Sequence, residues 1–484
     1  MAERAWTAWR SPSDQRWRVR VEVASATPKC TVPTGFSALP PPGPKMVLGF
    51  GQQWKTGRPP QNALQIDDHF ISMQGMYRQR LLSNRLQRLT EHFPVTIVSG
   101  ARQVGKTTLL RHLFPQHDYV VFDASQDVEG ARRDPDLFLR NHPPPLVLDE
   151  IQHAPELVSA LKRAVDRAGA VSGQFILTGS QQWQVLKTIA ESLAGRAAFL
   201  DLQGFSLQEF SDADSSWLSQ WLDAPGQFLD WSRTAAYYAG DLQSWLWKGF
   251  MPGAQALPDD LITDFWQGYH RTYVERDARL IGDIQDWQEF GRFLGLMTAL
   301  TAQELNYSQL GREIGITPQT SKRWLQILEA TFQWFALPAF SGNPIKRVSQ
   351  RPKGHLADTG LACYHARLSS PRMLASHPLF GALFETAMVQ ELRKQAAAQG
   401  ISPSWYHWRS AGGAEVDLLL ERDGTLHPFE IKLTTNPCRK DVSGLAAFKT
   451  AHPSRHVGKG AVICAVEKPR WLQDDVLAIP WNLL

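Results

Sequence analysis

The sequence predicts an α/β protein of several domains, built around a parallel sheet that carries a phosphate-binding loop. Three observations lead to this fold class. The chain has 484 residues, and at about 150 residues per domain a single hydrophobic core does not suffice. Short apolar strands in the first half end in residue types that bind phosphate and magnesium. Two alternating apolar segments near the C-terminus flank a turn dipeptide and carry carboxylates and a lysine.

The composition indicates a packed, soluble protein and excludes several other classes. The chain has 51 Lys and Arg residues and 47 Asp and Glu residues, which leaves a net charge of +4. Because this excess is small, any site that binds a polyanion must be a local cluster of basic residues. Four cysteines without a CxxC pair suit a reducing compartment. No apolar segment reaches the roughly 18 residues of a membrane span, and no signal-peptide pattern stands at the start. We therefore expect a cytoplasmic protein without a membrane partner.

Residues 1–72 differ in composition from the rest of the chain. They hold nine of the 31 prolines and alternate basic residues with tryptophan, without helical or strand periodicity. This composition predicts disorder. A regular helical pattern starts only near Met76, so we expect the segment to be disordered or a mis-annotated extension, with translation starting at Met73 or Met76. The alternative is a basic arm that touches nucleic acid.

The folded part begins with a complete phosphate-binding motif. Residues 93–99 form an apolar, β-branched strand, and the next segment reads G-x-x-x-x-G-K-T before a helical pattern. The glycines let backbone N–H groups turn toward phosphate oxygens at the start of a helix. Lys106 is expected to reach the β- and γ-phosphates of ATP, and Thr107 to ligate Mg²⁺. The predicted nucleotide-binding residues are Gly100, Ala101, Arg102, Gln103, Val104, Gly105, Lys106, Thr107 and Thr108.

A second apolar strand, residues 146–149, ends in the carboxylates of Asp149 and Glu150. Acids at the tip of a buried strand need a cation or a proton to offset their desolvation. Asp149 is therefore predicted to hold the Mg²⁺ bound to Thr107, and Glu150 to act as the catalytic base that activates water. A strand capped by solvated acids is the alternative, which the phosphate loop disfavours.

Two later features extend this pattern. A third apolar strand begins at residue 174 and ends at Thr178 and Ser180, whose hydroxyls are placed to sense the γ-phosphate or the attacking water; we favour Thr178. Arg196 precedes the next strand. These strand tips resemble those of AAA+ ATPases, and the resemblance implies that Arg196 reaches the γ-phosphate of a neighbouring subunit in a homo-oligomer. A solvated arginine is the alternative.

Residues 205–300 are helical and rich in tryptophan, which predicts a helical lid packed on the ATPase core. Tryptophans at this spacing are expected in the hydrophobic core. A groove for a partner protein is the alternative.

Residues 301–355 predict a winged helix, in which two helices flank a glycine turn and begin at N-caps supplied by Ser308 and Thr317. A docking or lid module is an equal alternative to DNA contact. The residues that would face DNA are Thr320, Lys322 and Arg323 on the second helix, and Arg347, Arg351 and Lys353 of the wing.

Residues 414–433 contain a second group of candidate functional residues, whose pattern is typical of a metal site. Two alternating segments flank Asp423-Gly424, a dipeptide favoured in two-residue hairpin turns. This turn, or a four-residue loop, places Asp417 opposite Glu430 and Glu415 opposite Lys432, whereas a three-residue loop breaks the register. Strict alternation places these four charged residues on one face of the hairpin. The other face then carries Val416, Leu418, Leu420 and Ile431.

Opposed carboxylates repel each other, and a divalent metal ion reverses that penalty. Asp417 and Glu430 are therefore predicted to ligate Mg²⁺, with Lys432 as the catalytic lysine that orients or activates the attacking water. The alternative is a solvated hairpin face with a Glu415–Lys432 ion pair.

This hairpin resembles that of the PD-(D/E)xK nuclease superfamily, whose core places a helix with an acid before a hairpin with Asp and Glu-x-Lys. Residues 380–392 supply the helix, and the resemblance implies that Glu385 is a further metal ligand. Val416 stands where the superfamily often has proline. With residues 357–361 and the winged helix, residues 76–484 resemble a prokaryotic family of predicted ATPases with a nuclease-like domain of unknown function.

The sequence thus predicts an AAA+ core over residues 76–204, a lid over 205–300, a winged helix over 301–355 and a PD-(D/E)xK-like α/β domain over 356–484. The predicted function is binding and hydrolysis of ATP with Mg²⁺, coupled to a nuclease-like or DNA-binding C-terminal domain. The alternative is a nucleotide-controlled switch or scaffold whose C-terminal domain is a binding module without catalysis. Expected partners are ATP, DNA or another nucleic acid, and further copies of the chain.

Overall fold

The computed structural model describes residues 5–10, 17–22, 77–169, 171–180, 193–211, 216–274, 284, 286–342 and 350–484. The chain divides into two compact units, Met1–Gln65 and Ile66–Leu484. Among the described residues, no helix has the length and apolar character needed to cross a membrane.

The first unit contains an antiparallel hairpin, in which β1 (Ala5–Arg10) pairs with β2 (Trp17–Glu22). The sequence predicted no strand here, and that expectation was wrong for these two segments. β2 reads Trp-Arg-Val-Arg-Val-Glu, and such alternation of apolar and charged residues favours a strand. The rest of the predicted extension, up to residue 72, lies outside the described residues.

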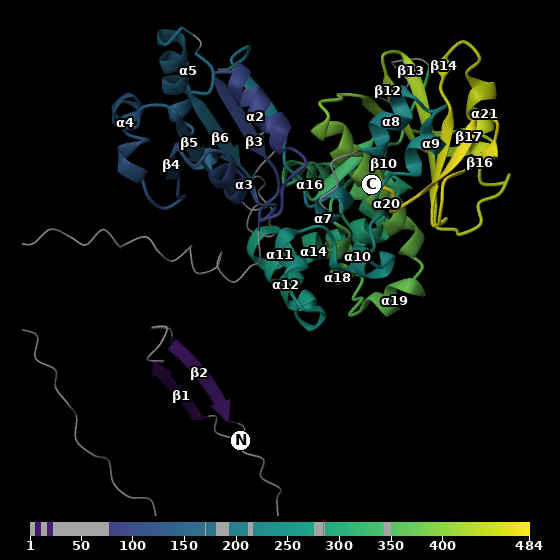
Figure 1. Cartoon of the computed structure of the whole chain (residues 1–484), viewed down its shortest axis with the longest axis horizontal. Helices are drawn as coiled ribbons and strands as arrows, with labels where there is room; N and C mark the ends of the chain where they lie inside the picture. Colours follow the sequence, from purple (N-terminus) through teal and green to yellow (C-terminus); the bar gives the residue numbers. More distant parts are fainter. Residues whose placement is uncertain are drawn as a thin grey trace, which may run out of the picture. The chain divides into compact units, whose positions relative to one another are not determined.

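The second unit begins with a parallel sheet (Figure 1). Its strands follow the order β4 (Asp118–Val121), β5 (Leu146–Asp149), β6 (Phe175–Gly179), β3 (Val95–Ser99) and β7 (Ala197–Asp201). Alternation along the strands sends Ile97 and Leu148 into one apolar cluster and Val98 and Val147 into another. The predicted apolar strands are confirmed, and their tips meet at one edge of the sheet because they run parallel.

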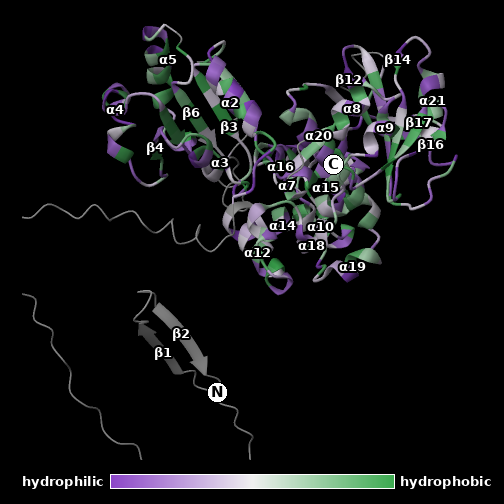
Figure 2. Cartoon of the chain, in the orientation of Figure 1, coloured by the Kyte–Doolittle hydropathy of each residue, from purple (hydrophilic) through white to green (hydrophobic). Residues whose placement is uncertain are grey.

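Helices cover both faces of this sheet. The helical segments are α2 (Ser83–His92), α3 (Lys106–Leu113), η1 (Val128–Gly130), α4 (Pro135–Asn141), η2 (Ile151–His153) and α5 (Leu157–Arg167). Buried leucines of α2 and α3 join one apolar cluster, and those of α4 and α5 join the other. Figure 2 shows hydrophobic strands β3 and β6 beside hydrophilic residues on α2 and α4. The helices therefore turn one face to the sheet and one to solvent.

Short helices follow, as the sequence predicted for residues 205–300. They are α7 (Leu207–Ser211), α8 (Trp217–Asp223), α9 (Phe228–Ser232), α10 (Leu242–Lys248), α11 (Pro252–Gln255), η3 (Asp259–Leu261), α12 (Ile262–Tyr269), η4 (His270–Val274) and α14 (Trp287–Ala299). α10 begins where the Asp241 side chain accepts a hydrogen bond from the Ser244 N–H at 2.8 Å, a standard N-cap. α14 begins in the same way at Asp286.

Tryptophans of these helices are buried against the C-terminal region. The contacts are Trp217 with Phe429, Trp221 with Trp471, Trp245 with Trp481, and Trp247 with the Leu368 carbonyl. The prediction that they belong to the core is confirmed for these four side chains. The prediction of a lid packed on the ATPase core was incomplete, because the helical region shares its apolar core with residues 356–484.

A small antiparallel sheet comes next, referred to below as the small sheet. Its strands follow the order β8 (Gln303–Glu304), β10 (Lys353–Leu356) and β9 (Trp334–Leu337). Two helices, α15 (Tyr307–Ile314) and α16 (Pro318–Ala330), lie between β8 and β9 in the chain. They meet at Gly315, whose φ of 91° allows the tight left-handed turn between them.

The helix caps in this region differ in part from the prediction. Thr317 caps α16 as predicted, accepting a hydrogen bond from the Thr320 N–H at 3.1 Å. α15 is capped by Asn306 rather than by Ser308, because the Asn306 side chain accepts a hydrogen bond from the Ser308 N–H. The predicted DNA contact Arg347 lies outside the described residues.

The C-terminal region is a mixed sheet between helices (Figure 1). Its main strand order is β11 (Ser404–Arg409), β12 (Glu415–Arg422), β13 (Thr425–Lys432), β15 (Gly460–Cys464), β17 (Val476–Pro480) and β16 (Arg470–Gln473), with β14 (His456–Val457) on β13. The helices are α18 (Thr359–His365), α19 (Pro371–Ala375), α20 (Phe380–Ala398) and α21 (Ser443–Ala451). α20 and α21 contribute to different apolar clusters, so each covers its own part of the sheet.

The hairpin of β12 and β13 turns at Asp423 and Gly424, as predicted. Arg422 pairs with Thr425, which leaves two residues in the turn. Asp423 and Gly424 have φ values of 51° and 78°, the conformation that two-residue hairpin turns require. The predicted register is therefore confirmed from Leu418, opposite Phe429, to the turn, and the predicted pairs of Asp417 with Glu430 and of Glu415 with Lys432 lie beyond the paired residues.

The predicted alternation fails near Asp417. Between the pairs that Tyr406 and Trp408 make with β12, Asp417 and Leu418 together oppose one residue of β11. This bulge shifts the side-chain pattern by one position. Val416 consequently joins the apolar cluster of α21, while the α20 cluster holds Leu418, Leu420 and Ile431. The prediction that these four residues share one face was wrong for Val416.

Candidate functional site

The phosphate loop connects β3 to α3 and turns at two glycines. Gly100 has a φ of 149°, and a Cβ atom there would collide with the Leu202 carbonyl oxygen. Gly105 has a φ of 94° and directly precedes α3. The backbone N–H groups at the start of α3 therefore lie beside the loop, where a helix N-terminus favours an anion.

The other loop residues divide into buried and accessible positions. Ala101 and Val104 are buried, whereas Gln103 and Thr108 are exposed. Arg102 is half-buried, with its guanidinium 3.8 Å from the Glu150 carboxylate. The accessible members can contact a bound molecule without rearranging the core.

Lys106 is buried and folds back over the loop. Its ammonium group donates hydrogen bonds to the carbonyl oxygens of Gly100 at 2.9 Å and of Ala101 at 3.0 Å. Phosphate oxygens form stronger, charge-assisted hydrogen bonds with an ammonium group than carbonyls do. The lysine is therefore held within the loop, where a phosphate can take over its bonds.

Asp149 joins three neighbouring elements at the carboxyl edge of the sheet. Its side chain is only 2% exposed. One carboxylate oxygen accepts hydrogen bonds from the Thr107 hydroxyl at 2.7 Å and the Tyr119 hydroxyl at 2.6 Å. The Thr178 hydroxyl donates to the other oxygen. The fold thus brings together three residues that the sequence singled out separately, Thr107, Asp149 and Thr178.

Tyr119 is a member of this network that the sequence analysis missed. Burial and the neighbouring Asp149 raise the pKa of its phenol, so the hydroxyl stays protonated and acts as a donor. β4 lies next to β5 in the sheet, with Val120 opposite Leu148. The sequence could have indicated this role, because Tyr119 lies on a short strand that precedes the Asp149 strand in the chain.

Glu150 follows β5 in a left-handed backbone conformation, with a φ of 57° and a ψ of 44°. Such a conformation costs a non-glycine residue about 1–3 kcal/mol and concentrates at functional sites. Gln152 donates hydrogen bonds to the Glu150 carboxylate and, at 3.3 Å, to the Ser180 hydroxyl. Thr178 and Ser180 therefore have separate partners, since Thr178 contacts Asp149 and Ser180 contacts Gln152.

Arg196 lies directly before β7 and forms an ion pair within the chain. Its Nε is 2.6 Å from the Asp166 carboxylate on α5, and about a third of its side chain is exposed. A further hydrogen bond runs to the Ala194 carbonyl at 3.2 Å. This geometry is compatible with a solvated arginine as well as with one that contacts a second subunit.

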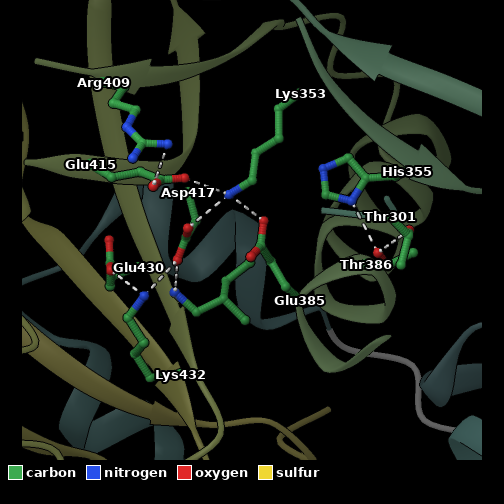
Figure 3. Close-up of polar contacts among 11 residues, drawn as sticks. Thr301, Lys353, His355, Glu385, Thr386, Arg409, Glu415, Asp417, Glu430 and Lys432 are labelled. Atoms are coloured by element: carbon green, nitrogen blue, oxygen red, sulfur yellow. Dashed lines mark hydrogen bonds and ion pairs between the residues drawn. The ribbon is translucent and has the colours of Figure 1, made fainter. Parts of the chain in front are cut away.

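The acids of the C-terminal region gather around the ammonium group of Lys353 (Figure 3). Its Nζ lies 2.6 Å from Glu385, 2.9 Å from Glu415 and 2.9 Å from Asp417. We refer to these three acids as the acid cluster. The sequence placed Lys353 on a wing that touches DNA, and that prediction was wrong. Every residue of β10 is buried, so the side chain of Lys353 turns into the protein.

Lys432 neutralises the other side of the same site. Its Nζ lies 2.7 Å from Glu430 and 3.4 Å from Asp417. Glu415 pairs with Lys353 and, at 3.9 Å, with Arg409, so the predicted Glu415–Lys432 pair is replaced by other partners. Asp417 and Glu430 are buried, so the alternative of a solvated hairpin face was wrong.

The charges of this site depend on burial. Burial, followed by repulsion from Asp417, raises the pKa of Glu385 and of Glu430 to about 8 each. Burial also disfavours the charged form of Asp417, but Lys353 and Lys432 hold its pKa below the usual range. For both lysines the carboxylates outweigh burial and raise the pKa. Asp417 is therefore held as a carboxylate between two ammonium groups.

This arrangement does not fit a divalent metal ion as it stands. Over the residues that the structure describes, no group of three or more His, Cys, Asp or Glu side chains could hold a metal ion. The predicted ligands Glu385, Asp417 and Glu430 do lie in one region, but the Lys353 ammonium stands between Glu385 and Asp417. A lysine thus occupies the position that the sequence analysis assigned to Mg²⁺.

Comparisons with known proteins assign residues 92–211 of the second unit. Residues 92–211 match a family model described as an AAA domain. Residues 239–372 and residues 380–484 match two domains of unknown function, DUF8612 and DUF4143. The prediction of an AAA-type ATPase domain is therefore confirmed over residues 92–211. The nuclease resemblance of the C-terminal region stays a prediction.

Relatives and solved structures extend over more of the chain. The uncharacterized proteins Rv2008c of Mycobacterium tuberculosis and Mb2031c of Mycobacterium bovis are each 26% identical over 406 residues, which is 84% of this chain and of theirs. The Walker-type ATPase PABY2304 of Pyrococcus abyssi is 14% identical, with a TM-score of 0.36 over 60% of this chain and 96% of its own. The RuvB Holliday junction branch migration motor of Thermotoga maritima is 13% identical, with a TM-score of 0.27 over 59% and 93%.

Proposed function

We propose that this protein binds ATP together with Mg²⁺ and hydrolyses it to ADP and phosphate. The observation that carries the proposal is the 2.7 Å contact between the Thr107 hydroxyl and Asp149, beside the phosphate loop. A hydroxyl and a carboxylate are oxygen donors that suit Mg²⁺, directly or through water. When bound, Mg²⁺ offsets the negative charge of the β- and γ-phosphates. The AAA domain match over residues 92–211 supports the same function.

The loop residues bind and orient the nucleotide. Backbone N–H groups between Gly100 and Thr107 surround the phosphates, and Lys106 exchanges its two carbonyl partners for β- and γ-phosphate oxygens. Because Lys106 already lies within the loop, this exchange requires a rotation of its side chain and no refolding of the backbone.

Glu150 is the general base of the proposed reaction. It accepts a proton from water while the water oxygen bonds to the γ-phosphorus and the bond to the β-phosphate oxygen breaks, which releases ADP and phosphate. The carboxylate is now held by Gln152 and lies near Arg102. Nucleotide binding beside Arg102 draws that guanidinium away and frees Glu150 to orient the water.

The decisive experiment measures ATP binding and phosphate release separately. Lys106→Ala is expected to abolish binding, whereas Glu150→Gln is expected to keep binding and lose turnover. Lys162→Ala changes an exposed lysine on α5 and serves as the control, with wild-type behaviour. Normal phosphate release from both Lys106→Ala and Glu150→Gln refutes the proposal.

The small sheet and its helices support contact with DNA as part of this function. α14, β8, α15, α16, β9 and β10 follow one another in the order of a winged helix, with the Gly315 turn joining α15 and α16. Lys322 and Arg323 are exposed on α16. Removal of one basic side chain from a DNA phosphate lowers the slope of log affinity against log salt by about 0.9.

Fluorescence anisotropy with a DNA duplex at several salt concentrations tests this contact. The double variant Lys322→Ala/Arg323→Ala is expected to bind more weakly with a lower salt slope, and Lys162→Ala is expected to match wild type. Equal binding by all three proteins favours the docking alternative, in which this module contacts a protein.

A second candidate function concerns the C-terminal region. The Lys353 ammonium at the acid cluster favours a binding module without nuclease activity, controlled by the nucleotide state of the AAA-type domain. Incubation of the protein with DNA and RNA, in Mg²⁺ or Mn²⁺ against EDTA, distinguishes the two. Cleavage that requires metal and disappears in Lys432→Ala supports a nuclease, and intact substrates under every condition support the binding module.

A further inference from the structure

The acid cluster contains a cation that belongs to the chain itself. Lys353 is 2% exposed, and its Nζ contacts Glu385, Glu415 and Asp417 at 2.6 to 2.9 Å. The acids come from α20 and β12, whereas Lys353 comes from the small sheet (Figure 3). A basic side chain from one region of the fold is thus buried among acidic side chains of another.

The ammonium group stands where a metal ion would have to bind. A divalent cation bound by the same carboxylates lies roughly 2.0–2.6 Å from their oxygens. Nζ contacts one oxygen of each acid at a slightly longer distance. The two cations cannot share this space, because one carboxylate shell would then have to offset both charges at close range.

The backbone of Lys353 is held by strand pairing on both sides. Folding of the small sheet therefore places the ammonium group at the acid cluster. Lys353 pairs with Glu304 of β8 on one side and with Leu337 of β9 on the other. The neighbouring Arg351 carbonyl also contacts His407 of β11 at 3.0 Å. Only rotation of the side chain, or movement of the small sheet, can withdraw the ammonium group.

We propose that Lys353 is a tethered counter-cation that keeps divalent metal ions out of the acid cluster, and that a metal site forms there when this charge is removed. The proposal is independent of ATP hydrolysis. It identifies the small sheet as the element that decides whether the C-terminal region can bind metal.

Mn²⁺ binding to nucleotide-free protein, measured by electron paramagnetic resonance, tests this inference. All proteins carry Asp149→Asn, so that the phosphate-loop region contributes no metal site. Lys353→Met is expected to gain one bound Mn²⁺ per chain, at least about tenfold tighter than any site of its parent. Lys353→Arg keeps the charge and is expected to gain none. Adding Asp417→Asn to Lys353→Met is expected to abolish the gain.

Two results overturn the proposal. The first is a Mn²⁺ site in the parent protein that Asp417→Asn removes, because the cluster would then bind metal with Lys353 in place. The second is a folded Lys353→Met protein, verified by circular dichroism, that gains no Mn²⁺. If Lys353→Met unfolds without metal, the proposal requires Mn²⁺ to restore its melting transition, and failure of that rescue also counts against it.

Discussion

Arg80 and Glu209 form a buried ion pair, with 2.9 Å between Nε and Oε1 and no more than 5% of either side chain exposed. Arg80 lies just before α2, and Glu209 lies on α7. The same guanidinium donates hydrogen bonds to the Val104 and Gln203 carbonyls at 2.6 Å each. One arginine therefore connects the phosphate loop, the segment after β7 and the helical region.

Replacement of Arg80 by alanine is expected to lower the free energy of unfolding by about 3–5 kcal/mol, because Glu209 would keep a buried charge without its partner. ATP affinity is expected to fall as well, since the Val104 carbonyl of the loop loses its donor. Urea denaturation and calorimetric titration with ATP measure the two effects. Arg78→Ala removes an exposed arginine nearby, and an equal loss of stability in that control would contradict the prediction.

The substitution Gly100→Ala is expected to displace the phosphate loop and abolish ATP binding. A methyl group at this position collides with the Leu202 carbonyl oxygen, and the φ of 149° is strained for any other residue. Gly291→Ala is the matched control, because Gly291 lies within α14 and a Cβ there meets no atom within 4 Å. Alanine at that position is expected to stabilise the protein by about 0.5–1 kcal/mol. Retained ATP affinity in Gly100→Ala would show that the loop does not hold nucleotide.

Thr178 and Ser180 are expected to differ in their effect on turnover. Thr178→Val removes the hydroxyl that donates to Asp149 and is expected to lower kcat roughly 10- to 100-fold, as loss of a hydrogen bond to a metal-holding carboxylate does. Ser180→Ala removes a contact to Gln152 and is expected to have a smaller effect. Steady-state phosphate release checks both variants, and a larger effect of Ser180→Ala would make Ser180 the sensor.

Arg196→Ala is expected to lower kcat only under conditions where the protein is oligomeric, if the arginine reaches the γ-phosphate of a neighbouring subunit. Asp166→Ala removes the intramolecular partner of Arg196 and is expected to preserve activity. Phosphate release measured across a dilution series, with mass photometry in ATP at each concentration, relates turnover to assembly. Equal activity of Arg196→Ala and wild type in the oligomer would leave Arg196 as a solvated residue.

Stability is expected to fall between pH 7 and pH 5 because of His427. Burial, and then the neighbouring charges of Arg422 and His456, lower the pKa of His427 to about 4, against about 6.5 when unfolded. The unfolded chain therefore binds the proton first as the pH falls, and the folded state loses about 2 kcal/mol by pH 5. The stabilisation is complete above pH 6.5.

Urea denaturation of wild type and of His427→Leu at pH 7 and pH 5 measures this effect. The comparison concerns the difference between the two pH values for each protein, so a general loss of stability in the variant does not affect it. An unchanged pH dependence in His427→Leu would exclude His427 as the cause.

Short-range patterns in the sequence were sufficient for much of the fold and for the nucleotide site. The G-x-x-x-x-G-K-T segment and the Asp149-Glu150 strand end have fixed spacing because the chemistry of each needs its own few consecutive residues. The Asp423-Gly424 turn is likewise local, since its dipeptide alone favours the backbone angles observed. In a parallel sheet these strand ends meet at one edge, which brought Thr107 and Asp149 together.

The C-terminal site depended on contacts that no local pattern contains. Lys353 lies 64 residues before Asp417 in the chain, and its position followed from the pairing of β10 with β8 and β9. In the sequence, Lys353 follows several other basic residues, a pattern that predicts an exposed side chain. Val416 was misplaced for a related reason, because the bulge that shifts it arises from pairing with β11.

The tryptophan contacts between the helical region and the C-terminal region provide an intrinsic optical probe. Trp217, Trp221, Trp245 and Trp247 are buried at this junction, whereas residues 77–180 contain no tryptophan. Fluorescence excited at the indole band therefore comes from tryptophans outside residues 77–180, these four among them. A change in emission on adding ATP would register a movement transmitted beyond the nucleotide site, without any label on the protein.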